Sequence, residues 1–243
     1  MWFARAQRSP MIRPAWTDEE ELMDRPGHPA SVVAENLADL RRVNAVLGGV
    51  SLTLAALADL AGDLRPGATL SIVDVGTGAA DIPRRASAWA RSRGWRPTAL
   101  ATDLGLEIVR AAAGTRPGLA LVVADGRRLP LRDGAFDVAM CSLLLHHLPP
   151  EGVVALLQEM ARVSRRGVIV NDIVRWWPGY WGAWLLSRLF TRNPLTRHDG
   201  PLSVRKAYTR DEIADLVGRA GLRPVAWHGY LGYRVSLALV PSA

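Results

Sequence analysis

The sequence predicts an α/β fold with a mostly parallel sheet and helices on both faces. From residue 65 onward, short apolar runs alternate with segments of helical periodicity. A glycine-containing loop follows the first of these runs, and the last two runs are joined by a short turn with no helix between them. Because parallel strands need a long crossover connection, the alternation indicates parallel strands, whereas the last pair must be an antiparallel hairpin.

Two parts of the chain are expected, an N-terminal arm with a helical cap over residues 1–64 and one main domain over residues 65–243. The chain has 243 residues, of which 49% are hydrophobic, enough for one substantial core. Residues 1–29 are polar and aperiodic, with an acidic cluster at Asp18, Glu19, Glu20 and Glu21, and are predicted to be loosely ordered. Apolar residues recur at helical spacing over 30–64, and Gly48-Gly49 divides this segment into two helices.

The remaining elements follow from hydrophobic periodicity and turn residues. The predicted strands are 70–75, 97–102, 119–123, 135–140, 166–171, 223–228 and 233–240. The predicted helices between them are 80–92, 105–113, 150–163 and 210–219. A substrate-binding insertion is expected at about 173–208.

A ligand site is predicted where the first strand ends in Gly76-Thr77-Gly78. Glycines at a strand-to-helix turn allow close backbone approach, and the helix N-terminus supplies unpaired N–H donors. Asp103 ends the second strand and Asp125 the third, so both carboxylates are expected in the same crevice, on a ribose and near an adenine.

The acidic residues of this loop distinguish two cofactors. A nicotinamide dinucleotide would prefer a third glycine where this chain has Asp81, and Asp74 and Asp81 would repel its pyrophosphate. Both carboxylates suit the cationic sulfonium and ammonium groups of S-adenosylmethionine.

Residues 70–170 resemble class I S-adenosylmethionine-dependent methyltransferases. The similarity is carried, in order, by Val73-Asp74-Val75-Gly76-Thr77-Gly78, Ala101-Thr102-Asp103, Ala124-Asp125, Leu129-Pro130-Leu131 and Phe136-Asp137-Val138. It implies a Rossmann-like, seven-stranded sheet with an antiparallel last strand, and places Cys141 and Ser142 under the transferable methyl group. The expected cofactor-binding residues are Asp74, Gly76, Thr77, Gly78, Asp103, Leu104, Asp125, Gly126, Cys141 and Ser142.

Two histidine sites are candidates for a general base, which methyl transfer can use but does not require. His198 beside Asp199 lies in the polar segment Arg197–Gly200, interpreted as a loop, and a solvated loop tip explains the same residues. His146, followed by His147, comes after the fourth strand, where a structural or cofactor-shielding role is the alternative. We expect His198 ahead of His146, with Asp199 orienting the imidazole.

An aromatic segment, 176–190, carries tryptophans at helical spacing. Core packing, a wall of a hydrophobic substrate pocket, and an interfacial helix at a membrane surface are three interpretations of this face. The predicted substrate-binding residues are Trp177, Trp181, Trp184, Arg197 and Tyr208.

A narrower similarity, to bacterial polyketide, phenolic-lipid and quinone methyltransferases, predicts the substrate class. It implies methylation of a small aromatic or polyketide-derived hydrophobic compound in secondary metabolism, at a phenolic oxygen. The alternatives are C-methylation of a quinone or phenolic ring, and a cyclase or decarboxylase that binds the cofactor without transferring methyl.

Composition argues against several other classes. The net charge is +7, but the basic residues are scattered and no appended basic domain is evident, so we expect no nucleic-acid partner and no RNA methylation. One cysteine, Cys141, excludes a disulfide framework and a thiolate zinc site, and we expect no metal. Without a signal peptide or an apolar run long enough to span a bilayer, a cytoplasmic monomer or homodimer is expected, with peripheral membrane contact as an option.

Overall fold

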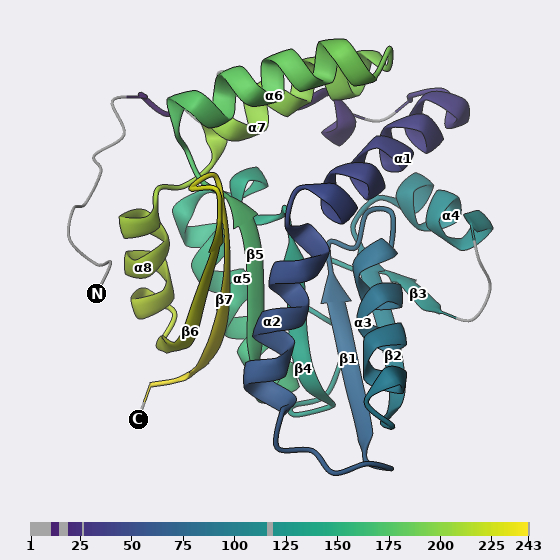
Figure 1. The fold of residues 1–243 in the computed structure, drawn as a ribbon, viewed down its shortest axis with the longest axis vertical. Coiled ribbons are helices and arrows are strands. Elements are labelled where there is room, and N and C mark those ends of the chain that lie inside the picture. The colour runs from purple at the N-terminus through teal and green to yellow at the C-terminus, as the bar shows by residue number, and fades with distance from the viewer. Residues whose placement is uncertain (1–10, 15–18, 26, 116–118, 243) are drawn as a thin grey trace.

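The computed structural model describes residues 11–14, 19–25, 27–115 and 119–242 (Figure 1). The strands of the sheet are β1 (Thr69–Val75), β2 (Arg96–Asp103), β3 (Ala120–Val123), β4 (Phe136–Ser142), β5 (Ser164–Ile173), β6 (Leu222–Tyr230) and β7 (Arg234–Pro241). The α-helices are α1 (Ala30–Val46), α2 (Gly49–Ala61), α3 (Asp81–Ser92), α4 (Leu106–Thr115), α5 (Pro150–Val163), α6 (Trp177–Phe190), α7 (Pro194–Lys206) and α8 (Arg210–Arg219). Short 3-10 helices are η1 (Leu22–Asp24) and η2 (Leu145–His147).

The seven strands form one sheet in the order β3-β2-β1-β4-β5-β7-β6. The first five strands pair in parallel, and β7 pairs antiparallel with both β5 and β6. This topology confirms the predicted seven-stranded sheet, its antiparallel last strand and the final hairpin.

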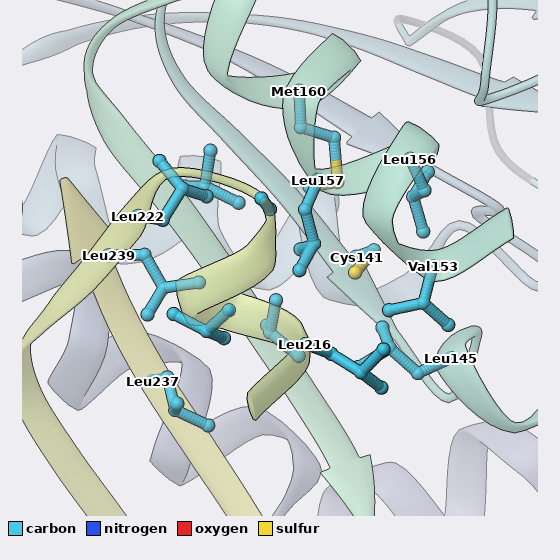
Figure 2. Close-up of a cluster of buried hydrophobic side chains, with 14 of the residues drawn as sticks. Cys141, Leu145, Val153, Leu156, Leu157, Met160, Leu216, Leu222, Leu237 and Leu239 are labelled. Atoms are coloured by element: carbon cyan, nitrogen blue, oxygen red, sulfur yellow. The ribbon is translucent and has the colours of Figure 1, made fainter. Parts of the chain in front are cut away.

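Both faces of the sheet are buried, which explains why its central strands are continuously apolar. Leu70 and Ile72 of β1 belong to a cluster with α2 and α3, whereas Val73 and Val75 belong to the opposite cluster. The opposite cluster lies beneath α5 and α8 and includes Cys141 (Figure 2). In Figure 1, α1, α6 and α7 lie across the end of the sheet to which β1 points, above the carboxyl ends of the parallel strands.

The segment Arg197–Gly200, predicted as a loop, lies inside α7 instead. Asn193 caps this helix, because its Oδ1 accepts hydrogen bonds from the backbone of Leu195 at 3.0 Å and Thr196 at 3.3 Å. Proline in the first turn fits a helix start, since its missing N–H has no partner there. Asn193-Pro194 was therefore a usable start signal in the sequence.

The acidic arm is also more ordered than predicted over the part of it that the structure describes. Glu21 is buried, and the backbone N–H groups of Leu22 and Met23 donate to the two carboxylate oxygens of Asp199 at 2.8 and 3.0 Å. Asp18 of the acidic cluster lies outside the described residues. The arm is held against α7 by these contacts.

Replacing Gly167 by alanine is expected to cost about 2 to 4 kcal/mol of unfolding free energy. Gly167 has a φ of +148°, and an added Cβ would lie 2.3 Å from the backbone oxygen of Leu239 on β7. Backbone in a sheet cannot yield as a flexible side chain does, so the strands would separate locally. Urea unfolding measures the loss, with Gly218→Ala in α8 as the control.

The control position is a helical glycine with no atom within 4 Å of an added Cβ. Alanine there should be neutral or stabilising by up to about 1 kcal/mol. If the two variants had the same free energy of unfolding, β5 and β7 would not approach each other closely at Gly167.

Candidate functional site

The loop between β1 and α3 has the backbone conformation that the glycine pattern predicts. Gly76 has a φ of +66° and Gly78 a φ of +51°, a region that favours glycine. The backbone N–H of Thr77 donates to the carbonyl of Thr102 at 2.9 Å, which fixes the loop to β2. The loop therefore lies where β1 and β2 end together.

Asp74 is a buried carboxyl group with one oxygen left unpaired. The hydroxyl of Thr77 donates to its Oδ2 at 2.5 Å, and its Oδ1 is buried without a hydrogen-bond partner. Burial, together with the nearby carboxylates of Asp81 and Asp103, raises the pKa of Asp74 to about 8, although the hydrogen bond from Thr77 lowers it. The ionised form of this carboxyl group is disfavoured by burial, and a cationic ligand beside it would stabilise that form.

Asp103 and Asp81 complete the acidic group at this end of the sheet. Asp103 accepts hydrogen bonds from the backbone of Gly78 at 2.9 Å and of Gly105 at 3.1 Å, and burial raises its pKa. Asp81 accepts from the side-chain amide of Asn44 at 3.4 Å, and burial also raises its pKa. These three carboxylates, and their raised pKa values, fit a positively charged ligand rather than a pyrophosphate.

Asp125 has a different environment from the other three carboxylates. Its side chain is partly exposed and forms a salt bridge with Arg127 at 2.7 Å. This arginine lowers the pKa of Asp125. Gly126 follows Asp125, and a Cβ added to it would lie 2.5 Å from Cγ1 of Val75. The side chain of Leu104, after Asp103, is exposed. Contacts of these residues with an adenine ring remain a prediction.

Cys141 and Ser142 end β4 with their side chains in different surroundings. The Cys141 thiol lies in the apolar cluster under α5, and burial raises its pKa well above the usual value (Figure 2). The hydroxyl of Ser142 accepts a hydrogen bond from Nη2 of Arg234 at 3.1 Å. The thiol is therefore a core group, and the role of these two residues beneath a methyl group stays a prediction.

Arg234 is a fully buried residue that the sequence patterns did not single out. Its guanidinium donates to Asn171 Oδ1 at 2.7 Å and Asn44 Oδ1 at 2.8 Å. Burial lowers its pKa to about 10. The network joins β7 and β5 to α1, whose Asn44 in turn donates to Asp81 at the start of α3, beside the cofactor loop.

His146 forms a buried pair with Asp172, where β4 and β5 end. His146 Nδ1 lies 2.7 Å from Asp172 Oδ1. Asp172 also accepts hydrogen bonds from the backbone of Leu145 and Ile173, and His146 with these donors lowers its pKa despite burial. Because an ionised carboxylate only accepts, the proton of His146 is assigned to Nδ1, which leaves Nε2 as an acceptor.

The N-terminal arm covers the two adjacent histidines, His146 and His147. His147 Nδ1 is 2.9 Å from Asp24 Oδ2, and its Nε2 is 3.6 Å from Glu21 Oε2. Glu21 also lies 4.0 Å from Nε2 of His146 and 3.6 Å from the ammonium of Lys206. The acidic cluster was visible in the sequence, but nothing there linked it to residues more than 120 positions away.

This contact predicts a pH dependence of stability. Burial lowers the pKa of His147, but Glu21 and Asp24 outweigh it and raise the pKa to about 9 in the folded protein, from an ordinary value of 6.5. The resulting stabilisation is fully present below pH 6.5 and is lost as the pH rises through about 9. The stability difference between the wild type and His147→Asn should therefore shrink by about 3 kcal/mol between pH 6.5 and 9.5.

Urea unfolding of both proteins at the two pH values measures this change, and the comparison cancels titrations that the proteins share. His28→Asn is a control on the same arm. A wild-type to His147→Asn difference that is independent of pH would contradict the contact.

The second histidine pair also forms, but it lies on α7 and is more exposed. His198 Nδ1 is 2.7 Å from Asp199 Oδ1, and the side chain of His198 is 48% exposed. Asp199 is buried and holds the arm through Leu22 and Met23. The predicted histidine–aspartate contact therefore exists, and its carboxylate also has a structural task.

Four of the five predicted substrate residues lie on or beside α6, and Tyr208 lies apart from them. Trp177, Trp181 and Trp184 are on the exposed side of α6, 41%, 57% and 36% exposed, so the core-packing interpretation of this face is wrong. Arg197 is exposed and donates to the backbone carbonyls of Thr191 and Arg188. Tyr208 is buried, and its hydroxyl donates to the carbonyl of Leu148 at 2.7 Å. Roles for these residues in substrate binding remain predictions.

A hollow of about 1200 Å³ lies beside the acidic loop, between α1 and α3. It borders Asp81, but its charged lining is mostly arginine: Arg41, Arg42, Arg84, Arg85 and Arg91. A positively charged lining disfavours a sulfonium ligand, so the carboxylates at the strand ends are the better site.

Comparison with known proteins gives partial matches to this chain. Residues 73–170 match the family described as "Methyltransferase domain". A demethylmenaquinone methyltransferase of Beutenbergia cavernae is 31% identical over 147 residues, 56% of this chain and 60% of the relative. One of Streptomyces avermitilis is 26% identical over 188 residues, 72% of this chain and 77% of the relative.

A solved structure shows the same fold over most of the chain. The S-adenosylmethionine-dependent methyltransferase of Aquifex aeolicus is 18% identical, with a TM-score of 0.59, over 88% of this chain and 100% of that one. This likeness confirms the predicted Rossmann-like architecture, and the matched methyltransferase domain covers the strands that carry the predicted cofactor site.

Proposed function

We propose that this chain is a class I S-adenosylmethionine-dependent methyltransferase, which its matched domain and its fold support. It methylates a small hydrophobic substrate, aromatic or polyketide-derived, at a phenolic oxygen. The observation that supports this most is the buried His146–Asp172 pair, which lies at the carboxyl end of β4, next to the acidic cofactor loop.

The cofactor would be held by the three buried carboxylates and the loop between them. Asp103 is suited to the ribose hydroxyls, and Asp74 with Asp81 to the positively charged methionine part. The unpaired Oδ1 of Asp74 is consistent with this arrangement, because a buried acceptor is costly until a donor or cation reaches it. When bound, S-adenosylmethionine supplies an electrophilic methyl group.

His146 would act as the general base toward the phenolic hydroxyl. Its Nε2, which the arm covers in this structure, would have to be reached by the substrate to take the proton, and Asp172 would then stabilise the imidazolium through Nδ1. Glu21, 4.0 Å from Nε2, adds a second negative charge beside the protonated ring. Both carboxylates therefore favour the proton transfer that turns a phenol into a phenolate.

His198 is the second candidate for the base. Its contact with Asp199 resembles that of His146 with Asp172, but its ring is about half exposed and it lies on α7 rather than at a strand end. We rank His146 first because a base has to lie near the end of β4, where the cofactor loop and the substrate would meet.

C-methylation of a quinone or phenolic ring is the main alternative. The two relatives named above are demethylmenaquinone methyltransferases, which is the observation that favours it. The same base would form the phenolate whose ring carbon is then methylated, so the histidine pair does not separate the two outcomes. A cyclase or decarboxylase on the same fold is the third candidate.

One experiment separates these possibilities. The protein is incubated with methyl-labelled S-adenosylmethionine and either a long-chain phenol or a reduced demethylated naphthoquinone, and the products are located by mass spectrometry and NMR. A labelled methoxy group on the phenol supports the proposal, and a labelled methyl group bonded to a ring carbon replaces it with C-methylation. Cofactor binding without labelled product from any substrate would overturn both methylation proposals.

The proposal places this reaction in secondary metabolism in the cytoplasm. A buried, lone thiol at Cys141 suits a reducing compartment. Among the described residues, no single helix has the length and hydropathy to cross a membrane. Helices α1 and α2 taken together have that length and hydropathy, but the pair is bent by 59°.

A further inference from the structure

Helix α6 exposes the large apolar side chains that a helix of a globular protein normally buries. Trp181 is 57% exposed, Leu189 65% and Phe190 75%. Four further large apolar residues of this helix are also exposed: Trp177, Trp184, Leu185 and Leu186. A contiguous apolar surface of this kind marks a site for a partner or a membrane.

The face that α6 turns toward the protein is made of small residues. Ser187 is buried, and a Cβ on Gly200 of α7 would contact it at 3.9 Å. Gly179, two turns earlier, faces Val204 of α7 and Tyr233. The helix is therefore inverted relative to an ordinary amphipathic helix, with small residues inside and bulky apolar residues outside. In Figure 1 it lies at the outer edge of the molecule, with α7 beneath it.

A cationic hollow lies at the C-terminal end of the same helix. It has a volume of about 400 Å³ and is lined by Arg188, Arg192 and Arg197 together with Leu189, Phe190 and Thr191. The 25 residues from 174 to 198 contain no acidic residue, and three of their four arginines line this hollow, whereas Arg175 is buried and pairs with Glu212. Exposed apolar side chains thus adjoin guanidinium groups with no acidic side chain on the same segment.

We propose that the exposed face of α6 binds the surface of a membrane that contains anionic phospholipids. The tryptophans and leucines enter the boundary between headgroups and acyl chains, where indole rings are favoured. The arginine hollow binds the headgroup phosphate, for which a guanidinium is well suited.

A second copy of this chain fits the same face less well. In a two-fold symmetric dimer the same surface of each copy meets the other. The arginines of one hollow would then either face those of the other hollow or lie beside an apolar contact, and in neither case would they meet negative charge. An anionic membrane supplies negative charge and apolar surface together. This charge complementarity favours the lipid surface as the occupant.

Sedimentation with vesicles tests the proposal on the full chain. We expect binding to vesicles of phosphatidylcholine with phosphatidylglycerol, and weak binding to phosphatidylcholine alone. The variant Arg188→Gln/Arg192→Gln should bind the anionic vesicles about 30-fold more weakly, since each arginine near the surface contributes about fivefold. Phe190→Ser should weaken binding about tenfold, through lost apolar burial.

Each variant has a matched control far from α6. Arg65→Gln/Arg96→Gln changes the net charge by the same amount near the amino ends of β1 and β2, and Val225→Ser removes an apolar side chain of β6 that is 47% exposed. Both controls should bind vesicles as the wild type does. Titration with S-adenosylmethionine checks that every variant is folded.

Three results would overturn the proposal. They are binding to neither kind of vesicle, equal losses in the variants and their controls, and a dimer in light scattering that Phe190→Ser converts to a monomer. None of these results bears on methyl transfer to a soluble substrate, so the membrane proposal and the proposed reaction fail separately.

Discussion

Replacing His146 by alanine is expected to lower kcat for methylation of a phenol by about 10² to 10³, the usual contribution of a positioned general base. The proton of the phenolic hydroxyl would then have to pass to water during the transfer. The affinity for S-adenosylmethionine should change less than about threefold, because the carboxylates of the cofactor loop are untouched. Steady-state kinetics at saturating cofactor measure kcat, and calorimetry measures the affinity.

Two further variants make this prediction specific. Asp172→Asn should reduce kcat by about tenfold or more, since the buried pair loses the charge that stabilises the imidazolium. His198→Ala should change kcat less than about threefold. The opposite order, a large loss of kcat in His198→Ala and a small one in His146→Ala, would show that His198 on α7 is the base.

Replacing Asp74 by asparagine should stabilise the free protein and weaken its binding of S-adenosylmethionine. A pKa of about 8 in the folded protein, against an ordinary 3.8, means that folding opposes ionisation of this group. Stability is therefore lost as the pH rises from about 4 to 8, and an amide avoids that loss. We expect a net gain of about 2 kcal/mol at pH 7, because the shift is worth on the order of 4 kcal/mol and the unpaired amide donor offsets part of it.

The same variant should bind the cofactor at least tenfold more weakly, because a negative charge near the methionine part is removed. Urea unfolding at pH 5 and pH 8 should show a larger gain at pH 8. Asp137→Asn, at the start of β4 and paired with Arg165, is a control whose cofactor affinity should not change. A destabilised Asp74→Asn protein with normal affinity would show that Asp74 has a purely structural role.

Periodicity and glycine placement were sufficient for the architecture, because they are local signals. The runs around Val73, Val138 and Ile169 are apolar since both faces of the sheet are covered, and this gave strands whose ends agree to within two residues. The loop at Gly76 and Gly78 was predictable for the same reason, since its backbone conformation depends on those residues themselves.

The candidate site was predicted less completely, because its partners are distant in sequence. Asp24 contacts His147 across 123 positions, and Asn44 contacts Arg234 across 190. A pattern within one segment carries no information about such pairs, so the arm, Asp172 and Arg234 were missed. The tryptophans of α6 show the converse, since helical spacing was correct but could not tell which side of the helix faces the protein.

Calorimetric titration of S-adenosylmethionine into the wild type and Asp103→Ala tests most directly whether these strand-end carboxylates form the cofactor site. We expect a single site per chain in the wild type and a dissociation constant at least tenfold higher in the variant, from the loss of charge-assisted hydrogen bonds worth about 1.5 to 3 kcal/mol. The same affinity in both proteins would contradict the assignment of the cofactor to this end of the sheet.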